Sequence, residues 1–507
     1  MFFSKKTLSA AVALMATGSV ASADVTADDI WADFQAYMAG IGYEMTGTTT
    51  RQGNVLTASD VGMTGTFGPE AGTMQMQLGT FTLSENGDGS VDIRFPEVVP
   101  ITTEFEIDDG VRGRSNMEYR QQGAVVTASG TPADLSYVFS ADTISFVSDG
   151  LEIDGTETEE EIYTLRVDMS GLSGTTDMLL GSTRNYDQAL NAETATYSMI
   201  FSDPSGEGEG RITGSMDEVK FAGIAEVPLM VAQSLQTDMN TMLGAGFAVD
   251  GTFTTGRNDV KIMSTTPDAL FSGDITSDAS SLDVKMNKDG LTYAAGQSGM
   301  DVQISAPSVP FPIAFRVADT GFNLSMPLRT ADTAGAFALG FSMEGFSTDE
   351  AIWALIDPGA QLPRDPATLI LQITGKAKVL FDFLDPTALT AAQSEGETPA
   401  EIESADIEAL RLDIAGAELT GTGAFTFDNS QDVGPPQPVG GVNLRLEGGN
   451  GLIDRLVAIG LLPEEQAMAA RMMMGLLAVP GDTPDTLTSR IEINEQGHVM
   501  ANGQRIQ

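Results

Sequence analysis

Residues 74–95 read MQMQLGTFTLSENGDGSVDIRF, and this stretch decides the fold. Apolar and polar residues alternate with a period of two from Met74 to Leu78 and again from Val91 to Phe95, as in strands with one buried face. Between the two runs, Asn86-Gly87-Asp88-Gly89 provides residues that tolerate positive φ, which tight hairpin turns require. The stretch therefore predicts two antiparallel strands joined by a tight turn.

Alternating runs of this kind extend over most of the chain. They predict one β meander from about residue 45 to 211 and a second from residue 252, with later strands over 369–383 and 410–427. A loose internal similarity relates residues 167–173 to residues 341–347, as in chains built from repeated units, and each copy is predicted to be a strand that ends in a Gly-apolar-Ser bend. The predicted fold class is mainly β with a few helices, in which long twisted antiparallel sheets form two related halves.

Helical spacing interrupts this pattern at five places. The first predicted helix starts at the capping box Thr26-Ala27-Asp28-Asp29, and its apolar stripe consists of Ile30, Trp31, Phe34, Met38 and Ile41. The second runs from Val227 to Leu243 and places Pro228 in its first turn, where proline is tolerated. The others cover residues 351–356, 452–459 and 464–477, and the last two form a C-terminal helical pair.

These elements divide the chain into three parts. Residues 1–23 are a signal peptide, residues 24–250 carry the N-terminal helix and the first meander, and residues 251–507 carry the second meander and the helical pair. Two polar stretches of the second half are interpreted as irregular. Residues 393–406 are predicted to be an acidic loop or insert, and the Pro-rich residues 430–439 a linker.

The first 24 residues have the organisation of a cleavable export signal. Lys5 and Lys6 precede an apolar run over residues 8–20, and Ala21-Ser22-Ala23 forms a small-x-small cleavage site before Asp24. This run is shorter than the about 20 residues that cross a bilayer, so cleavage after Ala23 is preferred over an uncleaved anchor. We expect a mature chain without a transmembrane segment, in the periplasm or outside the cell.

The amino-acid composition excludes some classes of binding partner and favours others. The 507 residues have a net charge of −45 and include no cysteine and one histidine, so stability rests on buried apolar area and not on disulfides. The acidic surface repels the phosphates of nucleic acid, and no nucleic-acid partner is predicted. The same charge fits divalent cations and cationic partners, or adaptation to a salty environment.

The residue inventory predicts no catalytic, cofactor-binding or metal-binding residues. Zinc sites need several His or Cys ligands, and His498 is interpreted as a turn residue. Gly375-Lys376 is followed by Ala377 where a phosphate loop needs Ser or Thr. For the acidic groups at Asn86–Ser90 and Glu157–Glu161, a hairpin turn and a solvated loop are preferred over calcium sites. We therefore expect no cofactor and no enzymatic activity.

Several short segments resemble a known family. Thr26 to Trp31 is similar to the start of the domain-of-unknown-function 2125 (DUF2125) family, and so are residues 442–463 and the ending from Ile491 to Gln504. The ending also resembles YdgA-type and AsmA-like envelope proteins. That wider resemblance implies a β-rich protein of the cell envelope connected with outer-membrane maintenance and lipid traffic, and it implies no site residues.

The sequence is compatible with two arrangements of the sheets, and each arrangement predicts a different function. A sheet curled into an AsmA-like groove would leave an apolar face accessible to lipid, whereas a filled sandwich would cover that face. The first hypothesis is thus an exported, non-enzymatic envelope protein that binds lipid or another apolar ligand. The alternative is a soluble periplasmic structural or interaction protein whose partners are envelope proteins, and an uncharacterised hydrolase is third.

Overall fold

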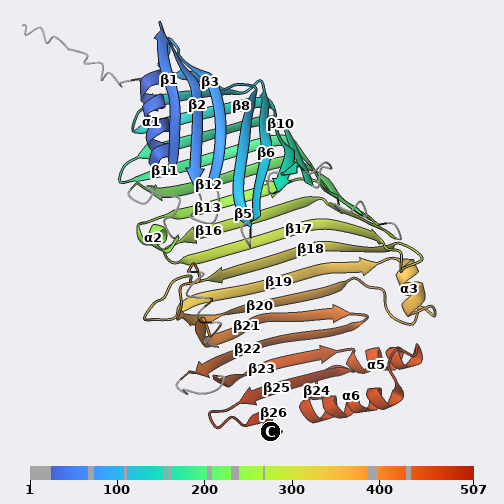
Figure 1. Ribbon diagram of the computed structural model, residues 1–507. Helices are drawn as coiled ribbons and strands as arrows, with labels where there is room; N and C mark the ends of the chain where they lie inside the picture. The colour runs from blue at the N-terminus through green and yellow to red at the C-terminus, as the bar shows by residue number, and fades with distance from the viewer. Residues whose placement is uncertain are drawn as a thin grey trace, which may run out of the picture.

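The computed structural model shows one large antiparallel β-sheet with short helices at its margins (Figure 1). It describes residues 24–507 except 41, 67–72, 108–110, 154–155, 158–162, 203–207, 230–238, 267–268, 386–389, 391, 393, 395–397 and 430–435. Strands account for 66 % of the structure and helices for 13 %. The predicted mainly β, antiparallel class is confirmed.

The N-terminal elements are α1 (Ala27–Gly40), β1 (Tyr43–Gln52), β2 (Val55–Thr66), β3 (Thr73–Glu85), β4 (Val91–Arg94), β5 (Val98–Ile107), β6 (Val111–Gln122), β7 (Val125–Thr131), β8 (Asp134–Ile153), β9 (Thr156–Glu157), β10 (Tyr163–Leu180), β11 (Thr183–Ser202), β12 (Glu209–Pro228) and α2 (Met239–Gly244). Those that follow are β13 (Ala248–Thr255), β14 (Asn258–Thr266), β15 (Ala269–Ser277), β16 (Ala279–Asn287), β17 (Gly290–Ser305), β18 (Ile313–Met326), β19 (Gly335–Thr348), α3 (Glu350–Ile356), β20 (Ala367–Val379), β21 (Ala400–Ile414), β22 (Ala417–Asp428), β23 (Gln437–Glu447), α5 (Gly449–Ala458), α6 (Glu464–Leu477), β24 (Val479–Pro480), β25 (Thr486–Ile493), β26 (Val499–Ala501) and β27 (Gln504–Arg505).

The N-terminal end of the sheet closes around α1. Thr26 caps this helix as predicted, because its hydroxyl accepts a hydrogen bond from the Asp29 N–H at 3.2 Å and the Asp29 carboxylate accepts one from the Thr26 N–H at 3.0 Å. The apolar stripe of α1 packs on strands β2–β4 and, from the other side, on β8, β10 and β11. This is the larger of the two buried clusters in the described part of the chain.

The sheet contains the same strand arrangement twice. Strand β3 pairs with β5 and β4, which lie end to end along it, and β6 and β7 then connect these to the long β8. In the second unit, β12 pairs with β13 and β14, and β16 and β15 connect these to the long β17. The two units occupy residues 73–153 and 209–305.

A line of kinked residues, called the crease here, crosses the strands from β10 to β19. Its positive-φ members, with φ between 50° and 69°, are Gly171, Glu218, Gly299 and Gly345. Pairing is interrupted beside the crease and resumes in the same register. Met169 and Leu172, three residues apart, therefore lie in one apolar cluster. The crease bends the strands while keeping the apolar side chains on one face.

The similarity between residues 167–173 and residues 341–347 has a structural counterpart in the crease. Both segments were expected to be strands that end in a bend. Instead, β10 and β19 continue through Gly171 and Gly345. A residue in the left-handed conformation costs about 1–2 kcal/mol unless it is glycine, which explains the glycine in each copy.

The predicted C-terminal helices are confirmed, and Figure 1 shows α3, α5 and α6 at the same side of the ladder of strands. Asp349 caps α3 by accepting a hydrogen bond from the Ile352 N–H at 3.1 Å. Helix α5 begins without a cap of its own. The Asp485 carboxylate accepts hydrogen bonds from the N–H groups of Asn450 and Gly451, at 3.0 and 2.9 Å.

Three further predictions of secondary structure are wrong. Pro228 is not in the first turn of a helix but is the last residue of β12, opposite Thr183, where the missing N–H of proline is tolerated. The acidic residues 400–406 are not a loop but the start of β21, and the predicted strand over 410–427 is split between β21 and β22. Lys378 of β20 lies opposite Glu401 of β21 in the strand register.

A single sheet takes the place of the two successive sheets expected. Asp250, near the expected boundary, lies inside β13 and pairs with Ile224 of β12 and Lys285 of β16. Residues 437–439 of the predicted linker belong to β23. Residues 430–435, the predicted signal peptide with Ala21 and Ala23, and Ile41 lie outside the described residues.

Candidate functional site

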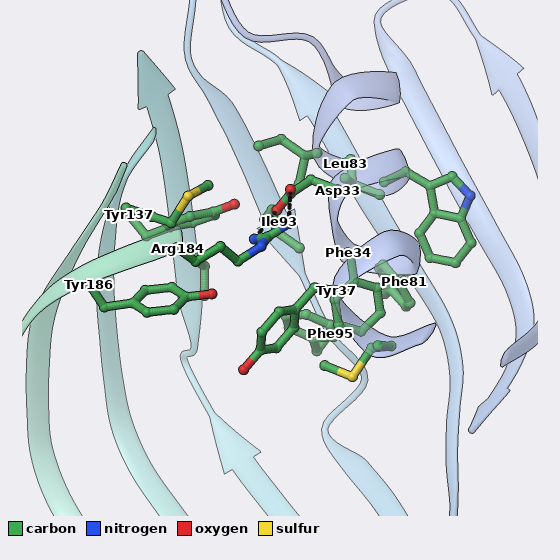
Figure 2. Close-up of a pocket in the computed structure, with 15 residues that line it drawn as sticks. Asp33, Phe34, Tyr37, Phe81, Leu83, Ile93, Phe95, Tyr137, Arg184 and Tyr186 are labelled. Carbon is green, nitrogen blue, oxygen red and sulfur yellow. Dashed lines mark hydrogen bonds and ion pairs between the residues drawn. The ribbon is translucent and has the colours of Figure 1, made fainter. Parts of the chain in front are cut away.

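A cavity of about 270 Å³ lies between α1 and the strands that surround it. Figure 2 shows aromatic side chains from α1 and from β3 facing side chains of β8 and β11 across it. The lining residues named in the figure are Asp33, Phe34, Tyr37, Phe81, Leu83, Ile93, Phe95, Tyr137, Arg184 and Tyr186. The wall is thus mainly aromatic and aliphatic.

Helical spacing places the α1 side chains in this wall. Ile30, Phe34 and Met38 follow one another at intervals of four residues, so they share one face of the helix. Trp31 stacks at the same end, with its ring centroid 5.7 Å from that of Phe81. The ring of Phe81 lies 5.0 Å from Phe95. These contacts hold one side of the cavity rigid.

One ion pair crosses the cavity wall. Arg184 of β11 donates to the Asp33 carboxylate of α1, with Nη1 at 3.1 Å from Oδ2 and Nη2 bonded to Oδ1. The Arg184 and Asp33 side chains are 8 % and 18 % exposed. The guanidinium also lies 5.2 Å from the centre of the Tyr37 ring. Because removing charges from water is costly, only this close pairing makes the burial tolerable.

Burial changes the pKa values of the ionisable groups around the cavity. It raises the pKa of Tyr137 to about 12, and the nearby Asp33 charge acts in the same direction. Burial also raises the pKa of Tyr186. For Arg184, burial alone would lower the pKa, but hydrogen bonds to Asp33 and Tyr186 outweigh it and the pKa is raised. At neutral pH both phenols are therefore neutral and Arg184 is charged.

The apolar wall of the cavity continues onto the open sheet. Met178 pairs with Tyr186, and the cross-strand neighbours that follow on the same face are Ala225, Val249 and Met286. A longer line on this face is called the apolar row. It consists of Leu190, Phe221, Phe253, Leu282, Ala295, Phe322, Phe341, Leu371, Leu410, Gly421 and Leu444.

Four members of the apolar row are exposed and the others are half-buried. Phe221, Phe322 and Phe341 are 36 %, 38 % and 42 % exposed, whereas side chains inside a filled sandwich are buried. The row spans strands β11 to β23, and at about 4.8 Å per strand it is about 50 Å long. A contiguous apolar surface that is partly exposed is a candidate interaction site.

The opposite face of the same strands is polar. Asp250 and Lys285 form an ion pair there at 2.9 Å, and Arg316 pairs with Asp301 at 2.9 Å. Ile224 is exposed on this face, and its cross-strand neighbours are Asp187 and Asp250. The apolar row is therefore a property of one face and not of the whole surface.

Helix α6 carries a second exposed apolar set. Met468 and Met472 are 72 % and 70 % exposed, and Met473 and Leu476 are also exposed. Methionine is usually a core residue, whereas Met472 and Met473 lie on the surface. No helix in the described part of the chain is long and apolar enough to cross a membrane.

The residues considered from sequence for other chemistry lie in ordinary structural positions. Residues 86–90 form the turn between β3 and β4, where Asp88 accepts hydrogen bonds from the Ser90 N–H and hydroxyl at 3.1 and 2.7 Å. His498 lies in the turn between β25 and β26, where its N–H donates to Asn494 at 3.0 Å. Lys376 is inside β20, and Glu157 is in β9, while residues 158–161 lie outside the described residues.

Sequence reasoning missed the polar residues of the cavity. Asp33 and Tyr37 are four residues apart on α1 beside the apolar stripe, and this spacing was the one signal available for them. Arg184 and Asp33 are 151 residues apart, so their pairing has no local signature.

The comparison with protein families finds a match in the second part of the chain. The family whose model matches is described as "Uncharacterized protein conserved in bacteria (DUF2125)", and the match covers residues 265–503. This part of the chain belongs to the DUF2125 family. The predicted family resemblance is confirmed there, while the segment Thr26 to Trp31 precedes the match. The DUF2125 region includes the apolar row from Leu282 onward. No curated protein matches the chain.

Proposed function

We propose that this protein is an exported, non-enzymatic envelope protein that binds lipid along the apolar row. The observation that carries the proposal is the exposure of Phe221, Phe322 and Phe341 in one continuous apolar row. An acyl chain lying on this face would gain about 0.8 kcal/mol for each methylene removed from water. No catalytic group is needed for such binding.

Export is the second part of the proposal. The residues that support it are Lys5, Lys6 and the Ala21-Ser22-Ala23 site, followed by Asp24 as the first mature residue. A periplasmic location, or one outside the cell, would bring the chain into contact with the lipids of the envelope. The relation to AsmA-like proteins and a role in outer-membrane maintenance belong to the same proposal.

The test is native mass spectrometry, with lipid extraction, on the mature protein purified from its own envelope fraction. We expect co-purified phospholipid or fatty acid, and uptake of a fluorescent fatty acid by the protein after delipidation. The variant Phe221→Asp should lose most of this uptake. Its matched control is Ile224→Asp on the opposite face of the same strand, which should retain uptake.

The outcomes separate the two main hypotheses. Equal loss in both variants would point to damage of β12 and not to a binding face. An apo mass, together with no uptake of fluorescent fatty acid by the unmodified chain, would refute lipid binding. The structural or interaction protein would then be the better hypothesis.

A further inference from the structure

The apolar row and the cavity under α1 together suggest the orientation of a bound lipid. We propose that the cavity receives the methyl end of a single unbranched acyl chain, whose polar end lies further along the sheet. This inference rests on the proposed lipid binding and adds a defined subsite and a direction to it.

The first argument is the continuity of the apolar surface. Met178 and Tyr186 belong to the cavity wall, and their cross-strand neighbours Ala225, Val249 and Met286 lead away from it over β12, β13 and β16. An acyl chain on this face can therefore enter the cavity without crossing a polar surface.

The second argument is that the one cationic side chain among the described lining residues is already paired. Arg184 is its cation, and both carboxylate oxygens of Asp33 already accept hydrogen bonds from it. A carboxylate or phosphate placed beside this pair would meet the negative charge of Asp33 after losing its own hydration, which is costly. A methyl end meets no such cost, because apolar cavities bind apolar groups.

The third argument is size and closure. The cavity volume of about 270 Å³ is below the roughly 300–1,000 Å³ of sites that enclose a whole small molecule. In its wall Leu83 is almost completely buried, and Val91 of the same buried cluster is completely buried. The cavity thus suits the end of one chain and stops it there.

The two tryptophans of the protein provide the test. Trp31 lines the cavity, whereas Trp353 lies on α3 with Arg364 packed 5.5 Å from its ring centre. In a Trp353→Phe chain, emission therefore reports the cavity alone. The probes are two hexadecanoic acids, one brominated next to the methyl end and one brominated next to the carboxylate, since bromine quenches indole emission at contact.

We expect the methyl-end bromine to remove most of the Trp31 emission and the carboxyl-end bromine to leave it nearly unchanged. The matched control, Trp31→Phe with Trp353 retained, should show neither effect. Equal quenching by both probes, or stronger quenching by the carboxyl-end probe, would overturn the orientation. Bound fatty acid in the mass spectrum without any quenching would overturn the subsite but leave lipid binding standing. No bound fatty acid at all would instead refute the proposed function.

A second variant tests the subsite independently of fluorescence. Val126 lines the cavity from β7, and Val126→Phe should fill part of it. Binding of saturated fatty acids should tighten about four-fold for each methylene that enters the cavity, until the end wall is reached. In Val126→Phe this limit should occur at a shorter chain length. An unchanged limit in the folded variant would contradict the subsite.

Discussion

Removing the Asp33 carboxylate gives the sharpest test of the packing around α1. In Asp33→Ala, the Arg184 guanidinium would keep its charge at 8 % side-chain exposure without its partner. Breaking a buried pair in this way costs about 3–5 kcal/mol. Because the Asp33 side chain itself is 18 % exposed, some water can reach the site, and we expect a loss of about 3 kcal/mol.

The assay is urea unfolding of the Trp353→Phe chain, followed by Trp31 emission and compared with circular dichroism. A surface pair provides the matched control. Arg166 and Asp168 are 56 % and 34 % exposed, so Asp168→Ala should cost at most about 1 kcal/mol. The double change Asp33→Leu with Arg184→Met removes both charges, and it should recover most of the stability lost in Asp33→Ala.

Two results would refute this reasoning. If Asp33→Ala costs no more than Asp168→Ala, water reaches the pair and the site is not a low-dielectric one. If the double variant is less stable than Asp33→Ala, the pair contributes net stability of its own, and relief of an unpaired charge is not the main effect.

Three further changes have expected outcomes. Burial raises the pKa of Tyr137 to about 12, so the stability that its neutral phenol contributes should be complete below about pH 10 and decline between pH 10 and 12. Tyr137→Phe should reduce this decline in alkaline denaturation followed by tyrosinate absorbance, while the contribution of Tyr186 remains. Gly299→Ala forces a Cβ into the Asp278 carboxylate at a φ of +60°. It should lower the free energy of unfolding, measured by thermal unfolding, by about 1–3 kcal/mol. A cost near zero would show that the crease tolerates any residue. Asp485→Ala removes the cap of α5 and should lower the free energy of unfolding by about 1 kcal/mol. The readout is faster amide exchange at Asn450, and unchanged exchange would contradict the cap.

Local patterns predicted the local structure well. The periodicity of residues 464–477 coincides with α6, and the capping box at Thr26 and the turn at residues 86–90 form as expected. In each case the determining contacts are only a few residues apart. The prediction failed for β21, where acidic composition indicated a loop, because its stability depends on strands on both sides, including Lys378 of β20.

The candidate site could not be predicted, because it depends on contacts between distant parts of the chain. The cavity exists only where α1 meets β8, β10 and β11, and the pairing of Asp33 with Arg184 appears only after the sheet closes around the helix. The apolar row has a similar origin. Alternation shows that Phe221 and Phe341 each lie on an apolar face, but the register between strands determines that they fall on one line.

The crease has a consequence for how the length of the apolar row can change. Its kinked residues are carried by individual strands, such as Gly299 in β17 and Gly345 in β19. A hairpin inserted into the sheet would therefore bring its own bend with it and extend the row by about 10 Å, the width of two strands. Removing a hairpin would shorten the row by the same step. The number of hairpins therefore sets the length of the apolar row, and the bend of each strand stays the same when that number changes.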